Sequence, residues 1–203
     1  AGQRLFDFRP VLRNRSAMAY SIAYCVHTWE MMALKGWAVA FLAFVAIHTD
    51  TSDAMIPPTV IATVVILMGV VTSLAGNEIS IRFGRQRLVK IAMAMTILLA
   101  TTMGFYATSS YLAASLFVLA YTGFVWLDSS SLTAGSAASA DPSRRGATLA
   151  IHSMLGYAGG FVGPLALGLV LDWAGGMSPE AWGYAFAHIA GVVLLGRIAF
   201  GLL

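Results

Sequence analysis

The chain has 203 residues, of which 59% are hydrophobic and only 10% are charged, and its mean hydropathy is +0.79. Soluble globular proteins have roughly 45–50% apolar and about 25% charged residues. A chain this poor in charge cannot form the solvated surface of a soluble enzyme, and it is too apolar to be disordered. We therefore interpret it as an integral membrane protein.

Charged or turn-rich breaks divide the chain into six long apolar segments. A helix needs ~20 mostly apolar residues to cross ~30 Å of hydrocarbon, so the pattern predicts an all-α protein with six transmembrane helices. A basic segment, 1–16, precedes them. The predicted spans are about 17–47, 57–74, 88–106, 111–139, 146–173 and 181–203. The first is longer than one straight crossing requires, so we expect tilt or local unwinding near Lys35 and Gly36.

Lysine and arginine are distributed unevenly between the two sides of the predicted bundle. Ten of the twelve fall before the first span or in the second and fourth connections: Arg4, Arg9, Arg13, Arg15, Arg82, Arg85, Arg87, Lys90, Arg144 and Arg145. The opposite connections carry Asp50, Asp53 and Glu180. The positive-inside rule then places the N-terminus and the basic loops in the cytoplasm. We expect the membrane to be a bacterial inner membrane. Cysteines placed at Ser52 and Ser143 should label from opposite sides.

The basic loops also bear on the choice of partners. A net charge of +3 could indicate nucleic-acid binding, but no aromatic residues are interleaved with the basic ones. Contact with lipid headgroups accounts for these loops, and we expect no nucleic-acid partner.

The connection between the second and third spans reads GNEISIRFGRQR and resembles the signature loop of the major facilitator superfamily. In that loop a glycine, then an aspartate and an arginine, then a glycine and a basic pair join two helices of each six-helix half. Arg82, Gly84 and Arg85 match the pattern. Asn77 replaces the first glycine and Ile81 replaces the aspartate, a degeneration typical of the copy in the second half.

The missing aspartate leaves the arginines of this loop without their usual neighbour. We expect Arg82 and Arg85 to bond helix C-terminal carbonyls or an acidic residue near the same membrane face, such as Glu78 or Asp141.

The fifth span contains a run of closely spaced glycines. The pairs Gly156/Gly160 and Gly159/Gly163 form notches that allow two helix backbones to approach, and Pro164 removes a backbone donor and permits a bend. The pattern resembles the glycine-proline motif in the fifth helix of superfamily antiporters. By repeat symmetry it also fits the eleventh helix, its counterpart in the second half.

The resemblance implies half of a major facilitator fold, with six helices arranged as two inverted three-helix repeats. The altered signature loop favours the C-terminal half of a twelve-helix transporter, with 1–16 as the end of its central cytoplasmic loop. A six-helix protein that pairs with a second copy is the alternative. The implied partners are the N-terminal half or that second copy, the lipid bilayer, and a small-molecule or ion substrate.

Three ionisable side chains are predicted to lie near the centre of the bilayer. His27 and Glu30 are close to the midpoint of the first span, and Asp128 is close to that of the fourth. A charge there costs at least ~2.5–3.5 kcal/mol on insertion scales unless it faces a cavity or a partner. In the superfamily the first helix of each repeat lines the central cavity, so the resemblance implies that these groups lie on a substrate or proton path.

Other polar and aromatic residues share one face of the first span. On a helical wheel this face contains Tyr20, Tyr24, His27, Met31 and Lys35, with Glu30 about 60° to the side. We expect Tyr20, Tyr24 and Lys35 to be further groups of the substrate or proton path, although tyrosines of this kind often only bond a neighbouring helix. Asp128, which precedes three serines, could equally act in transport or pair within the bundle.

The chain has no nucleotide-binding loop, zinc motif, nucleophile elbow or paired cysteines, so we expect no enzyme activity, cofactor or metal. We expect secondary active transport of a small solute by alternating access, coupled to protons through Glu30 with His27 as its partner. The alternative is a non-transporting scaffold or assembly protein that retains the fold. A solvent-accessible cavity reaching Glu30 and Asp128 would favour transport, and a dry, filled centre would favour the scaffold.

Overall fold

The computed structural model describes residues 7–51 and 56–202. Within these ranges the chain forms helices and no strand, and six of the helical segments are long and apolar enough to cross a membrane. They are Arg15–His48, Pro58–Phe83, Arg85–Ser109, Tyr111–Ser139, Pro142–Trp173 and Pro179–Leu202. The prediction of an all-α protein with six candidate spans is confirmed, and it indicates an integral, multi-pass membrane protein.

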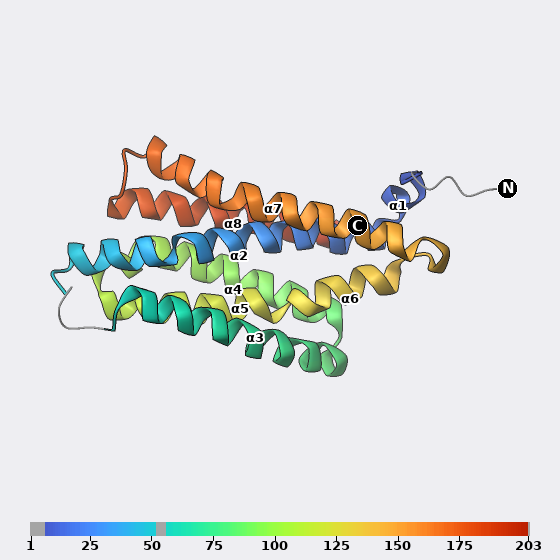
Figure 1. Ribbon diagram of the computed structural model, residues 1–203, viewed down its shortest axis with the longest axis horizontal. Coiled ribbons are helices and arrows are strands. Elements are labelled where there is room, and N and C mark those ends of the chain that lie inside the picture. Colours follow the sequence, from blue (N-terminus) through green and yellow to red (C-terminus); the bar gives the residue numbers. More distant parts are fainter. Residues whose placement is uncertain (1–6, 52–55, 203) are drawn as a thin grey trace.

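The helices follow one another with short connections (Figure 1). In chain order they are α1 (Arg9–Arg13), α2 (Arg15–His48), α3 (Pro58–Phe83), α4 (Arg85–Tyr106), the 3₁₀ turn η1 (Ala107–Ser109), α5 (Tyr111–Leu127), α6 (Ser129–Ser139), the 3₁₀ turn η2 (Pro142–Arg144), α7 (Arg145–Trp173) and α8 (Pro179–Leu202).

Local sequence signals set where several helices begin. The Asn14 side chain accepts a hydrogen bond from Ala17 N at 3.1 Å and so caps α2. Ser178 Oγ accepts from Ala181 N at 3.1 Å at the start of α8. Pro58 opens α3, where its missing N–H costs no helical bond.

The segment 76–87, predicted to be a loop, is helical on both sides of Gly84 and is called the signature segment below. This corrects the prediction that the second span ends near residue 74. α3 continues to Phe83, and Gly84 alone separates it from α4. Gly84 has φ +92°, a conformation that favours glycine, so the helix ends there rather than earlier. Between Gly76 and Gly84 no glycine or proline interrupts the helix, and Glu78 and Arg82 are spaced to pair along it.

The helix interruption lies in the fourth span and not in the first. α2 is continuous past Lys35 and Gly36, so of the two expected alternatives, tilt and local unwinding, the unwinding does not occur. The fourth span breaks at Asp128, which has φ −97° and ψ −6° and separates α5 from α6 (Figure 1). Aspartate and serine are weaker helix formers than alanine or leucine. The Asp128 side chain makes no capping bond to α6 and instead contacts His27 of α2.

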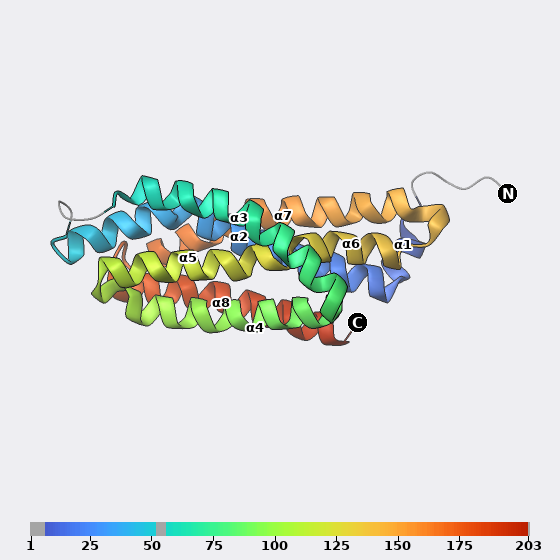
Figure 2. The ribbon, with the colours of Figure 1, turned by 90° about the horizontal axis from the view of Figure 1, so that it is seen from below.

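α2 lies at the centre of the bundle, with its largest interface against α7 (Figures 1 and 2). α4 packs mainly on α8, and α3 packs on α5. Between α2 and α8, Phe41 contacts Trp182 and Phe186 edge-on, with ring centroids 5.0 and 5.1 Å apart. These rings form part of the apolar core towards one end of the bundle.

The basic residues gather at one end. The start of α2, the α3–α4 junction, the α6–α7 turn and the end of α8 all lie there, whereas α2, α4 and α7 end at the opposite end (Figure 1). Arg4 and Asp53, which contribute to the charge pattern of the sequence, lie outside the described residues.

At the basic end, one arginine of the signature segment has an acidic partner. Arg82 donates from Nε and Nη2 to Glu78 Oε1 at 3.0 and 2.9 Å, which confirms the expected bond for this residue. Arg85 Nε is buried and has no hydrogen-bond partner within 7–51 and 56–202. Asp141 instead accepts from the backbone and side chain of Ser143.

Glu78→Gln should lower the stability of the protein by no more than about 0.5 kcal/mol, because exposed helical ion pairs contribute little. The two side chains are 69% and 59% exposed. Thermal unfolding of the purified variant checks this, and a large loss would mean that the pair is shielded by a further contact.

Candidate functional site

A buried polar cluster lies where α2 meets the broken fourth span. His27 and Glu30 come from α2 and Asp128 from the α5–α6 break, and each of the three residues is 4% exposed. The first and fourth spans thus bring together the three groups that the sequence places at membrane depth.

The first pair in this cluster joins His27 and Asp128. His27 Nδ1 lies 3.1 Å from Asp128 Oδ1, which makes an ion pair when the imidazole is protonated. Asp128 immediately precedes α6, where the first-turn amides favour a negative charge. His27 Nε2 is buried without a hydrogen-bond partner in the described part of the chain. His27 therefore contacts Asp128, and not Glu30 as its expected partner.

The second pair joins Glu30 to Tyr121, which is not among the predicted site residues. Tyr121 is fully buried on α5, and its hydroxyl donates to Glu30 Oε1 at 2.7 Å. Tyr121 lies seven residues before Asp128, which places both on one face of the fourth span. That spacing was a signal available in the sequence.

A second histidine lies close to the cluster. His152 of α7 is 2% exposed, and its ring stacks on Tyr24 at a centroid distance of 4.1 Å. Tyr24 also stacks on His27 at 5.8 Å, so one tyrosine ring connects the two imidazoles. His152 Nε2 lies 3.3 Å from Thr133 Oγ1. His152 is not among the predicted site residues, although its four-residue spacing from Gly156 places both on one face of α7.

The glycines of α7 allow the close approach expected of the notches. A Cβ added at Gly159 or Gly163 would overlap a backbone carbonyl of α2, and one added at Gly156 would overlap the ring of Tyr24. Thr28 Oγ1 lies 2.7 Å from Gly156 O and can donate to it across this interface. The two helices are therefore in backbone contact near the titratable cluster.

The other two residues of the motif lie on the same interface. A Cβ at Gly160 would lie 3.3 Å from Met32 Cγ, a tight contact with a flexible side chain. Pro164 lies within α7 without ending it, and its carbonyl accepts from Trp37 Nε1 at 3.0 Å.

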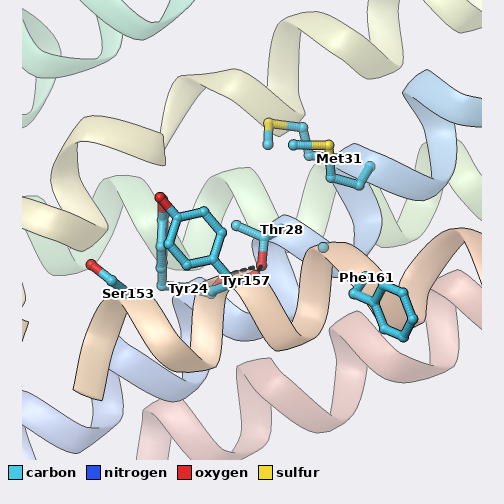
Figure 3. Close-up of a pocket in the computed structure, with 9 residues that line it drawn as sticks. Tyr24, Thr28, Met31, Ser153, Tyr157 and Phe161 are labelled. Carbon is cyan, nitrogen blue, oxygen red and sulfur yellow. Dashed lines mark hydrogen bonds between the residues drawn. The ribbon is translucent and has the colours of Figure 1, made fainter. Parts of the chain in front are cut away.

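A cavity of about 300 Å³ opens between α2 and α7 (Figure 3). Its lining consists of Tyr24, Thr28, Met31, Met32, Ser153, Gly156, Tyr157, Gly160 and Phe161. Glu30 and Asp128 are not part of this lining. Tyr24 is the residue that belongs both to the cavity wall and to the stack leading to His27.

Two residues of the predicted polar face lie away from this cavity. Tyr20 is buried against Gly135 and packs edge-on to Phe200, with ring centroids 5.2 Å apart. Lys35 is exposed, and it lies about 12 Å beyond His27 along α2, beside a small hollow that Thr122 also lines. The residues of the predicted polar face therefore do not all line the same cavity.

No family model matches this chain, and no curated protein matches it. The fold and the site define a class, an all-helical multi-pass membrane protein with titratable side chains buried between its helices. Among the residues that the structure describes, no group of three histidine, cysteine, aspartate or glutamate side chains is placed to hold a metal ion.

Proposed function

We propose that the chain is the C-terminal six-helix half of a major-facilitator-type secondary transporter, which moves a small solute by alternating access and couples it to protons. The observation that carries this proposal is the pair of buried contacts Glu30–Tyr121 and His27–Asp128. Each joins the first span to the fourth, and each includes a group that can take up or release a proton.

Stability of the fold alone does not account for a buried cluster of this kind. Replacing a buried ion pair with well-packed apolar residues is often neutral or stabilising, so stability alone does not require one. At membrane depth the cost of a charge is higher still. A carboxylate that is buried in one state and hydrated in another can load a proton on one side and release it on the other.

The pattern of helix contacts supports two inverted three-helix repeats. α2 packs on α7 as the fourth span packs on α3, and α2 packs on α8 as the fourth span packs on α4. Exchanging the first three spans with the last three leaves these neighbours unchanged, and inverted repeats predict such an exchange.

The proposal includes a partner for the half. α3 and α7 carry large apolar side chains on their outer faces, among them Leu67, Leu74, Tyr157 and Leu169, all more than 60% exposed. The N-terminal half of the same transporter or a second copy of this chain would cover part of these faces, and lipid would cover the rest.

The proposed orientation places the basic end in the cytoplasm of a bacterial cell. Ser52 lies outside the described residues, so Ser109, exposed at the opposite end, replaces it as a labelling site. Cysteines introduced separately at Ser109 and Ser143 of a Cys25→Ala variant should react with an impermeant maleimide from opposite sides. Labelling of Ser143 from outside intact cells would reverse the orientation, and labelling of both from one side would contradict six spans.

A non-transporting scaffold is the second candidate function. The observation that favours it is the 4% exposure of Glu30 and Asp128, whose side chains are covered within the bundle. Proton flux in vesicles tests both candidates. The reconstituted chain, with any second half that its gene encodes, should show saturable solute-dependent acidification of the lumen, read with the trapped dye pyranine. A scaffold should show none with any solute.

A further inference from the structure

The cavity between α2 and α7 limits the kind of molecule that can occupy it. We propose that it binds an uncharged solute with one or two flat rings and a single hydrogen-bonding group. This inference names the substrate class of the proposed transporter and, for its physiological role, rests on that proposed function.

The size of the cavity sets the size of the solute. Its volume of about 300 Å³ is twice that of an engineered cavity of roughly 150 Å³ that binds benzene. It also lies at the lower end of the range for small-molecule sites, about 300–1,000 Å³. A two-ring molecule matches such a space, whereas a disaccharide or a peptide would extend beyond it.

The lining offers no partner for a formal charge. None of the side chains that this chain contributes to the cavity is acidic, basic or a histidine, so a charge buried against this wall would have no counter-charge there and would lose its solvation uncompensated. Tyr157 and Phe161 present rings that are 81% and 71% exposed as whole residues. Aromatic rings pack favourably on a flat apolar ligand, and the two methionines of α2 can adjust to its shape.

Polar groups are available at one end of the cavity. Ser153 and the two tyrosines lie together there, and Phe161 lies at the other end (Figure 3). In the described ranges the hydroxyls of Tyr24, Ser153 and Tyr157 form no hydrogen bond, whereas Thr28 bonds backbone carbonyls. A hydroxyl or carbonyl on the solute would therefore be oriented towards Ser153, with its rings directed towards Phe161.

The cavity also adjoins the titratable cluster. Tyr24 forms part of the wall and stacks on both His152 and His27. A solute that displaces the Tyr24 ring therefore changes the packing of the imidazole that contacts Asp128. The binding site and the proposed proton site are separated by one aromatic side chain.

Three probes with the same ring system test the class of solute: 1-naphthol, 1-naphthoate and 1-naphthyltrimethylammonium. Binding is measured by equilibrium dialysis at neutral pH with the full chain in lipid nanodiscs, and binding to empty nanodiscs is subtracted. We expect saturable binding of naphthol, at least 10-fold tighter than of either charged probe, or about 1.4 kcal/mol. Absence of saturable naphthol binding overturns the proposal, and so does tighter binding of the cation, which would indicate an organic-cation site.

Variants of α7 test whether the cavity is the site. Ser153→Phe, which fills it, and the double variant Tyr157→Ala/Phe161→Ala, which removes its rings, should each weaken naphthol binding at least 10-fold. All three residues are exposed, so helix packing is preserved. Leu165→Ala is the matched control, because Leu165 is 53% exposed on α7 but outside the lining. Unchanged affinity in both cavity variants overturns the assignment.

These experiments distinguish failure of the proposed solute class from failure of the proposed transport function. Naphthol binding that depends on the cavity, in a protein without solute-dependent proton flux, would remove the transport function and leave the site. Proton flux driven by a charged solute and insensitive to Ser153→Phe would remove this substrate class and leave the transport function.

Discussion

Glu30→Gln should abolish solute-dependent proton flux and leave the folded protein intact. The Gln side-chain oxygen can still accept the hydrogen bond that Tyr121 donates to Glu30, so the contact between α2 and α5 is preserved. The amide cannot release a proton, however, so a cycle that couples protons through this position stops. Pyranine fluorescence in reconstituted vesicles with an imposed pH gradient measures the flux, and thermal unfolding measures the fold.

Two further variants make this result specific. Glu78→Gln neutralises an exposed acid at the basic end and should retain wild-type flux. Asp128→Asn should reduce flux less than Glu30→Gln, because the amide can still contact His27. Wild-type flux in the Glu30→Gln variant would eliminate Glu30 as the coupling group and leave His27 as the titratable candidate of α2. Loss of folded protein would instead assign Glu30 a structural role.

Gly159→Ala should destabilise the bundle more than an alanine substitution at a helical glycine whose added Cβ would meet no neighbouring atom. The added methyl group would overlap a backbone carbonyl of α2, which cannot move aside as a side chain can. Overpacking costs typically 1–3 kcal/mol, and we expect about 3 kcal/mol here because the two backbones must separate. Thermal unfolding of the purified protein in nanodiscs, together with its elution profile, measures the loss.

Gly191→Ala is the matched control for this substitution. Gly191 lies in α8, and apart from its chain neighbours and the adjacent backbone of α8, no atom of the described residues lies within 4 Å of the position where its Cβ would be. Alanine is the better helix former by about 1 kcal/mol, so this variant should be as stable as the wild type or more so. Equal destabilisation of both variants would contradict a backbone contact between α2 and α7.

The architecture was largely predictable from the sequence, because the length and apolarity of a span depend on the bilayer and not on tertiary contacts. The errors lie at charged residues. Glu78 and Arg82 suggest a loop when each is counted as a break, yet they pair along α3 and extend it beyond the apolar segment. The break at Asp128 was missed because the apolar residues before it continue the helical pattern and the three serines after it are compatible with a helix or a turn.

The site was predictable only in part. The cost of a charge at membrane depth correctly directs attention to His27, Glu30 and Asp128, which the structure brings into one region. Their partners depend on how α2 and α5 are rotated and shifted against each other, which a helical wheel of one span does not determine. The spacing of Tyr121 from Asp128 and of His152 from Gly156 gives the helix face of each residue, but their contacts with Glu30 and Tyr24 follow only from the placement of the neighbouring helices.

The interruption at Asp128 makes the fourth span a jointed element. α6 has 11 residues and so is about 16 Å long, and a tilt of about 10° at the joint would displace its far end by about 3 Å. At that end Ser139 O accepts a hydrogen bond from Asn14 Nδ2, and Asn14 also caps α2. A tilt of α6 at Asp128 would therefore also displace the start of α2, the helix that carries His27. The two spans are thus coupled at two points, the His27–Asp128 contact and the Asn14–Ser139 hydrogen bond.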